Sequence, residues 1–161
     1  MVNINKNIKK VCSFYVSDWH LITMLLPHIN EKINEEVKIT TILENDLREY
    51  METLLGKLRL KNTDKILNID WNKTKDLQAK LEEIINSDEV IVNGSMEFIN
   101  KSNKIIQKEL EGDEGKSIKI INCYDFNNYK DKIKEILDQH DTVLNTSGEK
   151  SKEEYLERIA N

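Results

Sequence analysis

A segment of twenty residues near the start of the chain, "VCSFYVSDWHLITMLLPHIN", contains five side chains that could do chemistry. They are Cys12, Ser13, Asp18, His20 and His28. Cysteine and serine act as nucleophiles when a base activates them, and histidine with carboxylate can transfer protons or hold zinc. The segment therefore raises two possibilities, a nucleophilic centre and a metal site.

The spacing of the histidines does not favour a metal site. The chain has three histidines, His20, His28 and His140, and it contains neither His-x-x-x-His nor Cys-x-x-Cys. At roughly 100° per residue, His20 and His28 lie about 80° apart around a helix, which is a poor arrangement for sharing one ion. We therefore predict no metal ligands and no cofactor.

Cys12 and Ser13 lie in an apolar run that is typical of a strand, where successive side chains point to opposite faces. A reactive thiolate needs an exposed, electropositive setting, which this run does not offer Cys12. Ser13 lacks the Gly-x-Ser-x-Gly elbow of serine hydrolases. The second cysteine, Cys123, is also in an apolar run, so we expect two buried thiols in a reducing compartment.

Length and charge narrow the function classes. The chain has 161 residues, enough for one domain, with 39% hydrophobic and 33% charged residues. A net charge of -5 opposes attraction to polyphosphate, and lysines alternate with acidic residues, as in "EKINEEVK". We therefore expect neither nucleic acid nor an anionic membrane surface as a partner.

The lengths of the apolar runs indicate where in the cell the protein is expected. No run approaches the eighteen or so apolar residues of a membrane span, and the start "MVNINKNIKK" lacks the apolar core of a signal peptide. We expect a cytoplasmic protein. The richness in asparagine, lysine and isoleucine indicates a prokaryotic source with an AT-rich genome.

Short β-branched and aromatic runs alternate along the chain with longer segments of helical periodicity. The predicted strands are 10–16, 37–43, 66–70, 90–93, 118–124 and 142–144. The predicted helices are 18–34, 46–60, 75–86, 97–111 and 128–139. Their predicted N-caps are Ser17, Asn45, Thr74, Ser95 and Asn127.

Helices that join consecutive strands imply parallel crossovers, so the pattern predicts an α/β fold. We expect a three-layer α/β/α sandwich with a mainly parallel sheet of five or six strands. Pro27 removes a hydrogen bond inside the first helix and is expected to kink it or to begin a second segment.

The tail "SKEEYLERIAN" opens with a capping box, Ser151 with Glu154, and places Tyr155, Leu156 and Ile159 on one side. It predicts a last helix that docks on the body or on a partner. The predicted organisation is one α/β domain over residues 1–148, followed by this helix within 149–161.

Open parallel sheets bind ligands beyond the carboxyl ends of their strands. The first such turn reads "YVSDW", without the glycines or Lys-Ser/Thr of a phosphate-binding loop. Aromatic and polar residues follow several strands, which predicts a site for a small organic ligand. The candidates are Tyr15, Asp18, Trp19, Asp70, Trp71, Ser95, Glu97, Tyr124 and Asp125. The alternative is that the aromatic side chains cap the sheet as part of the core.

Three stretches together resemble the MEDS domain, the methanogen/methylotroph DcmR sensory domain. They are "VCSFYVSDWHLITMLLPHINEKINEEVKITTI", "LNIDWNKT" and "IKIINCYDFNNYKDKIKEILDQHDTVLNTSG". Over residues 8–148, the matching positions are Tyr15, Pro27, Cys123-Tyr124-Asp125 and His140. Two positions depart from the family pattern: Asp141 replaces the usual proline, and Ser95 stands where relatives often have an acidic residue.

The resemblance implies a RecA-like core without a phosphate loop that senses small hydrocarbon derivatives. Family members are attached to DNA-binding or histidine-kinase modules, whereas this sequence has no such motif, so we expect a stand-alone sensor. Its partner would be a histidine kinase or a transcription regulator.

Two alternatives remain open. One is a ligand-free adaptor for a kinase or anti-sigma system that acts through the C-terminal helix or an exposed sheet edge. The other is a hydrolase using Asp18, Asp70 and Asp125, which requires these carboxylates to lie within a few ångströms of one another. A homodimer is a separate candidate for the assembly of the protein.

Overall fold

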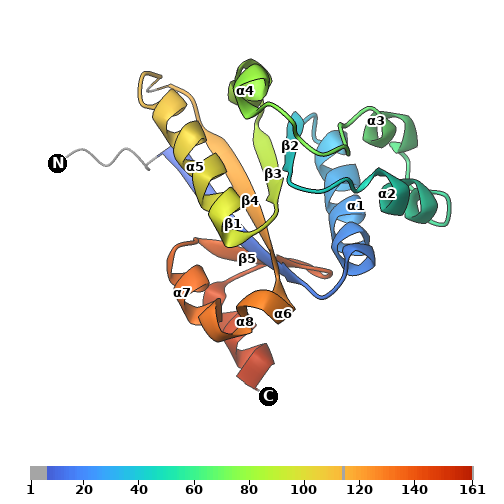
Figure 1. The fold of residues 1–161 in the computed structure, drawn as a ribbon. Coiled ribbons are helices and arrows are strands. Elements are labelled where there is room, and N and C mark those ends of the chain that lie inside the picture. Colours follow the sequence, from blue (N-terminus) through green and yellow to red (C-terminus); the bar gives the residue numbers. More distant parts are fainter. Residues whose placement is uncertain (1–6, 114, 161) are drawn as a thin grey trace.

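The computed structural model describes residues 7–113 and 115–160. These residues form an α/β fold around a six-stranded sheet with the order β2-β3-β4-β1-β5-β6 (Figure 1). The strands are β1 (Ile8–Tyr15), β2 (Ile39–Leu43), β3 (Glu89–Asn93), β4 (Ile118–Asp125), β5 (Thr142–Asn145) and β6 (Gly148–Lys150). The first five pair in parallel and β6 runs antiparallel to β5.

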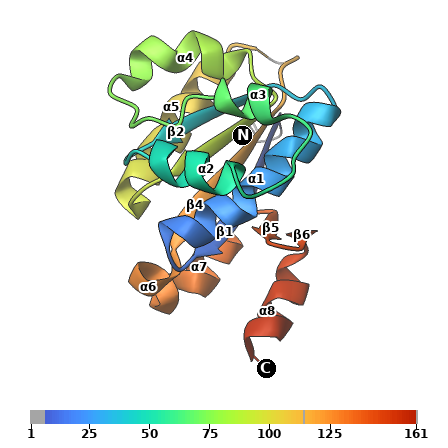
Figure 2. The same cartoon turned by 90° about the vertical axis from the view of Figure 1, so that its right-hand side faces the viewer.

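Helices cover both faces of the sheet, which confirms the three-layer sandwich and its RecA-like arrangement (Figure 2). One face is covered by α1 (Asp18–Asn34), α2 (Arg48–Leu55) and α3 (Thr63–Leu67). The other face is covered by α4 (Leu77–Ile85), α5 (Met96–Leu110) and α7 (Ile133–Asp138). Each layer of helices packs on its own cluster of buried apolar side chains.

Strand alternation divides the residues of β1 between these two cores. Val11 and Tyr15 belong to the core beneath α1, whereas Cys12 and Phe14 belong to the core beneath α5 and α7. The side chain of Ser13 contacts Met24 of α1 and donates a hydrogen bond to the carbonyl of Leu144 at 2.8 Å. Cys12 and Ser13 are therefore buried strand residues, as expected.

The prediction of a strand over residues 66–70 is wrong. Ile66 and Leu67 belong to the short helix α3, in which Ile66 is buried and Leu67 is exposed. The apolar run "ILNI" fits either a short strand or a buried helical turn, and length alone did not separate them. The residues that follow then run along the outer edge of β2.

This edge is closed by hydrogen bonds from the loop. The hydroxyl of Thr41 donates to the carbonyl of Asp70, and the amide of Thr74 donates to the carbonyl of Leu43 at 2.8 Å. The amide of Leu43 in turn donates to the hydroxyl of Thr74 at 3.0 Å. An edge strand paired in this way is protected from association with other strands.

Helix starts follow the capping prediction in two places. Ser17 caps α1 and Ser95 caps α5, each accepting a hydrogen bond from a first-turn amide. The other three predicted caps are wrong: α2 follows Leu47, α4 is capped by Asp76, and α6 (Phe126–Tyr129) is capped by Asp125. Thr74 is unavailable as a cap because its hydroxyl serves the β2 edge.

Other boundaries differ in length. The predicted helix 46–60 shortens to α2, and 128–139 divides into α6, a 3-10 turn (Lys130–Lys132) and α7. α1 continues through Pro27 without a second segment. The hairpin strand β6 was not predicted.

The C-terminal helix α8 (Lys152–Ala160) is confirmed, and it docks on the body. The Glu154 amide donates to the hydroxyl of Ser151 at 3.1 Å, as the capping box predicts. Tyr155 stacks on Phe14 of β1 with ring centroids 5.5 Å apart. Within the part of the chain that the structure describes, we find no helix with the length and apolar character to cross a membrane.

Candidate functional site

The turn between β1 and α1 contains only Val16 and Ser17. The hydroxyl of Ser17 accepts a hydrogen bond from the amide of His20 at 3.1 Å, and the amide of Val16 donates to Nδ1 of His20 at 3.0 Å. A phosphate cradle needs a longer loop with several amides directed at the ligand. The two-residue turn is too short to form one, and its Val16 amide is already held by Nδ1 of His20.

Tyr15 ends β1 at this turn, with its ring buried and its hydroxyl at the carboxyl end of the sheet. The hydroxyl accepts a hydrogen bond from Nδ2 of Asn93, the last residue of β3, at 2.8 Å. Burial raises the pKa of Tyr15 and outweighs the opposing effect of Asn93, while the nearby Cys123, Asp125 and Asp18 raise it further. The buried hydroxyl therefore keeps its proton at neutral pH.

Asp125 pairs with Tyr15 across β1 and β4, and Asp18 follows Tyr15 by three positions, so both carboxylates lie near Tyr15. Both carboxylates are half-buried. Asp18 lies in the first turn of α1, and Asp125 accepts a hydrogen bond from the Asn127 amide at 3.0 Å as it caps α6. Three predicted site residues are thus brought together at the ends of β1 and β4.

Trp19 gives this region an exposed aromatic surface. Its side chain is 45% exposed and meets the ring of Tyr50 from α2 edge-on, with centroids 4.7 Å apart at 82°. Edge-to-face contact is a favourable geometry for two aromatic rings. The neighbouring Val16 is 56% exposed, so apolar surface reaches solvent beside the carboxylate of Asp18.

The loop after β3 serves the fold. Ser95 caps α5, and its amide donates to Oε1 of Glu44 at 2.7 Å. A Cβ on Gly94 would lie within 2.7–2.8 Å of Glu44 and Phe98, so only glycine allows this approach. Glu97 is exposed on the first turn of α5. Ser95 and Glu97 therefore lie at the carboxyl end of the sheet. The hydroxyl of Ser95 is already engaged as the N-cap of α5.

Tyr124 belongs to the core, which is the alternative that the sequence left open for the aromatic residues. Its ring is 2% exposed and packs against Phe14, Tyr129 and His140 with centroids 5.8–6.1 Å away. Burial is the main reason that the pKa of Tyr124 is raised. Nε2 of His140 lies 3.0 Å from the Asn122 side chain, and burial lowers the pKa of His140 to about 4.

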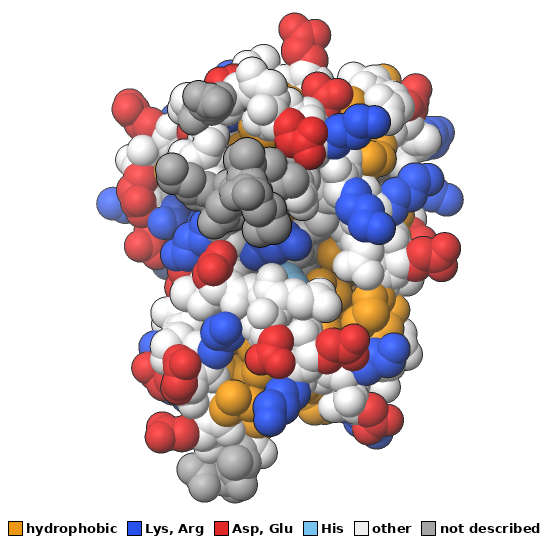
Figure 3. Space-filling model, turned by 90° about the vertical axis from the view of Figure 1, so that its left-hand side faces the viewer, with side chains coloured by type: hydrophobic (Ala, Val, Ile, Leu, Met, Phe, Trp, Pro, Cys, Tyr) orange, Lys and Arg blue, Asp and Glu red, His pale blue; other side chains and the backbone are white. Residues whose placement is uncertain are grey.

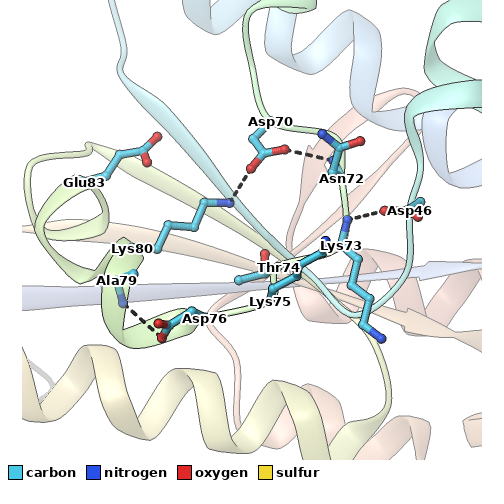
Figure 4. Close-up of a pocket in the computed structure, with 10 residues that line it drawn as sticks. All are labelled: Asp46, Asp70, Asn72, Lys73, Thr74, Lys75, Asp76, Ala79, Lys80 and Glu83. Carbon is cyan, nitrogen blue, oxygen red and sulfur yellow. Dashed lines mark hydrogen bonds and ion pairs between the residues drawn. The ribbon is translucent and has the colours of Figure 1, made fainter.

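Asp70 and Trp71 lie in a second region, beside β2. Trp71 is fully buried, and its Nε1 donates to the carbonyl of Ile66 at 2.9 Å. Nζ of Lys80 lies 3.4 Å from Asp70 and donates to the carbonyl of Thr41 at 2.6 Å, which ties α4 to the edge strand. Asp70 and Lys80 border a polar hollow of about 610 Å³ (Figure 4).

In Figure 4 the carboxylates of Asp46, Asp70 and Asp76 on the border of the hollow are each engaged by another lining residue. Lys80 points to Asp70, Asp70 also accepts from the Asn72 amide at 3.0 Å, and Asp76 caps α4. Partial burial raises the pKa of Asp70, but the bonds from Asn72 and Lys80 outweigh it, so the pKa is lowered. These contacts stabilise the loop that borders the hollow, which indicates a structural role for this region.

The three carboxylates of the hydrolase alternative are not gathered in one place. Asp70 contacts β2, which lies three positions from β1 in the sheet, whereas Asp18 follows β1. With strands about 4.8 Å apart, this separation is roughly 14 Å. Across residues 7–113 and 115–160, no group of three or more His, Cys, Asp or Glu side chains is arranged to hold a metal ion.

Sequence reasoning missed Asn93, Glu44 and Tyr50. Asn93 carried the clearest signal, since it is the polar last residue of an apolar strand at the binding edge. Tyr50 meets Trp19 only through helix packing, and Glu44 reaches Ser95 across 51 positions of sequence, so neither had a local signal.

Comparison with protein-family models finds no match for this sequence, and no curated protein matches it. The MEDS resemblance therefore stays a prediction from the quoted residues. The strand order agrees with the RecA-like sheet that the resemblance implies.

Proposed function

We propose that this protein is a non-enzymatic sensory or regulatory module of the MEDS type. It binds a small organic molecule at the carboxyl end of β1 and signals to a protein partner in the cytoplasm. The observation that carries the proposal is the two-residue turn after β1, which places Tyr15, Asp18 and Trp19 where a nucleotide-binding α/β protein has its phosphate loop.

The chemistry of these residues defines the ligand class. Tyr15 offers a hydroxyl donor, Asp18 and Asp125 offer acceptors, and Trp19 with Tyr50 offers an apolar wall. Small-molecule sites combine apolar walls with a few polar groups that fix orientation. Two carboxylates repel phosphate, so a neutral or cationic organic molecule fits and a nucleotide does not.

A thermal-shift screen tests this proposal. The probes are short-chain alcohols, halogenated alkanes and alkylamines, with Mg-ATP as the nucleotide probe. A ligand at 100 times its Kd raises the unfolding free energy by about 2.7 kcal/mol, which is readily detected. We expect at least one organic probe to raise the Tm and Mg-ATP to leave it unchanged.

Variants localise such a ligand. Tyr15→Phe and Asp18→Asn are expected to remove the shift, whereas the control Asp70→Asn, which alters the second region, keeps it. Stabilisation by Mg-ATP, no stabilisation by any organic probe, or a shift that survives both site variants contradicts the proposal.

The second candidate is the ligand-free adaptor, and a specific observation favours it. Leu156 and Ile159 of α8 remain 37% and 49% exposed although Tyr155 is docked. An adaptor of this kind would bind its partner through α8 and would show no response to any small molecule in the thermal-shift screen.

A further inference from the structure

We propose that α8 is a strap that opens separately from the rest of the fold. It swings away from the body about Ser151, while the sheet, including β6, stays folded. The closed form is held by the contact between Tyr155 of α8 and Phe14 of β1. The strap lies at the C-terminal end of the chain, and its opening does not depend on the proposed ligand site.

α8 is attached to the body mainly through one side chain. Of the α8 side chains that the structure describes, those of Lys152 and Tyr155 are half-buried and the others are exposed. The ring of Tyr155 stacks on Phe14 with centroids 5.5 Å apart and packs against the core beneath α5 and α7. By contrast, α1 and α5 each bury several side chains. A helix of this length is marginal by itself, so α8 opens at a small fraction of the free energy of global unfolding.

The strand before the strap is firmly anchored. Glu149 of β6 accepts hydrogen bonds from Nζ of Lys9 at 2.6 Å, from Nζ of Lys119 and from the hydroxyl of Thr142 at 2.9 Å. Partial burial raises the pKa of Glu149, but these bonds outweigh it and lower the pKa to about 2. β6 is therefore tied to β1, β4 and β5, and firm attachment ends at Ser151, the single residue between β6 and α8.

The contacts at this hinge allow the strap to move. The hydroxyl and the carbonyl of Ser151 accept hydrogen bonds from the amides of Glu154 and Tyr155, each at 3.1 Å. These bonds belong to the first turn of α8 and move with it. The ion pair of Lys150 with Glu154, at 3.7 Å, crosses the hinge on the surface, where such pairs contribute little to stability.

Opening of the strap uncovers an aromatic surface of β1. In the closed form Phe14 is 8% exposed, and its other neighbour is the ring of Tyr124, 6.0 Å away. In Figures 1 and 2, α8 lies at the lower end of the molecule and extends beyond the sheet. Figure 3 shows apolar side chains at the surface in the lower half of the α5 and α7 side, among charged side chains of both signs. The strap thus switches Phe14 between a covered and an exposed state.

Amide hydrogen exchange of the ¹⁵N-labelled full chain, without any ligand, tests the proposal. We expect the amides of residues 156–159 to be protected at least fivefold relative to an unfolded chain, because the strap is mostly closed. They should nevertheless exchange at least 100-fold faster than the central amides of β1 and β4, after correction for intrinsic rates. Low concentrations of urea should accelerate exchange in β1 and β4 but hardly in α8, since local opening exposes little surface.

Two neighbouring substitutions show which side chain closes the strap. Tyr155→Ala is expected to accelerate exchange in α8 at least fivefold. Leu156→Ala is the matched control, because Leu156 is already 37% exposed, and alanine favours the helix in both variants. Its α8 amides should exchange within twofold of the parent. In both variants the central amides of β1 and β4 should stay at least 100-fold better protected than those of α8.

Three results overturn the proposal. If α8 exchanges as slowly as β1 and β4, it opens only when the whole chain unfolds. If α8 has no protection in the parent, there is no closed form. If Tyr155→Ala and Leu156→Ala have the same effect, the stack on Phe14 does not hold the strap.

Discussion

The dipeptide Asp-Trp occurs twice in this chain, and the structure uses the two copies in opposite ways. Asp18 and Trp19 begin α1 at the carboxyl end of β1, where the Trp19 ring is 45% exposed. Asp70 and Trp71 follow α3 at the edge of β2, where the Trp71 ring is fully inside the core. The difference arises from the preceding element, a central strand in one case and a short helix in the other.

The two regions differ in how far their polar groups are already satisfied. Around Asp70, the bonds to Lys80 and Asn72 brace the loop against β2. Around Asp18, the Tyr15 hydroxyl retains its proton, and aromatic surface faces solvent. A ligand is therefore expected at the first region and a purely structural role at the second.

The largest effect is expected at Trp71. Trp71→Ala should destabilise the fold by about 3–5 kcal/mol, because it empties a large buried volume and removes the bond to Ile66. Trp19→Ala should cost under about 1 kcal/mol, since half of that ring is exposed. Urea unfolding of both variants gives the comparison. Similar losses would remove the contrast between the two regions.

Gly94 tests how tightly the carboxyl end is packed. Gly94→Ala should cost about 1–3 kcal/mol, because its Cβ would overlap Glu44 and Phe98. Gly112→Ala is the control, since no atom lies within 4 Å of its Cβ position. Denaturant unfolding of the two variants measures the difference, and equal stability would show that the loop after β3 moves aside.

Lys80 tests the bracing of the second region. Lys80→Met keeps most of the side-chain volume but removes the contacts with Asp70 and the carbonyl of Thr41. We expect a loss of about 1–2 kcal/mol, because the carbonyl loses a charged partner. Hydrogen exchange of the β2 amides should accelerate in this variant. Unchanged exchange would mean that the loop alone protects the edge.

The smallest effect concerns the pH dependence that Asp70 contributes. Its folded pKa is lowered, so its stabilising contribution is present above the unfolded value, near 3.8, and is lost as the pH falls through the folded pKa. Asp70→Asn should flatten the stability curve below about pH 4, by under about 0.5 kcal/mol because the group is exposed. Thermal unfolding from pH 2.5 to 7 measures this. A steeper curve in the variant would contradict the sign.

Fold class followed from the sequence because strand and helix periodicities alternate cleanly around the buried runs of β1, β3 and β4. The caps Ser17 and Ser95 were predictable because each stands directly between a strand and a helix. The region 66–76 was not, because a short apolar run supports both a strand and a helical turn. Its true role depends on bonds to Thr41 and Leu43, about thirty residues away.

The candidate site could be predicted from the sequence where its residues belong to a single turn of the chain. Tyr15, Asp18 and Trp19 are within five positions, so one turn brings them to the same edge of the sheet. Asp125 joined them because β4 is the neighbour of β1. Tyr124, the residue before it, points to the core, since one step along a strand reverses the direction of the side chain.

The two tryptophan indole N–H signals of a ¹⁵N-labelled sample test the central claim most directly. Each alkylamine, alcohol and halogenated alkane is added in turn, and Mg-ATP is added separately. We predict that at least one organic probe moves the Trp19 signal, that the Trp71 signal stays in place, and that Mg-ATP moves neither. A Trp19 signal that responds to Mg-ATP, or to none of the organic probes, would contradict a ligand site at the end of β1.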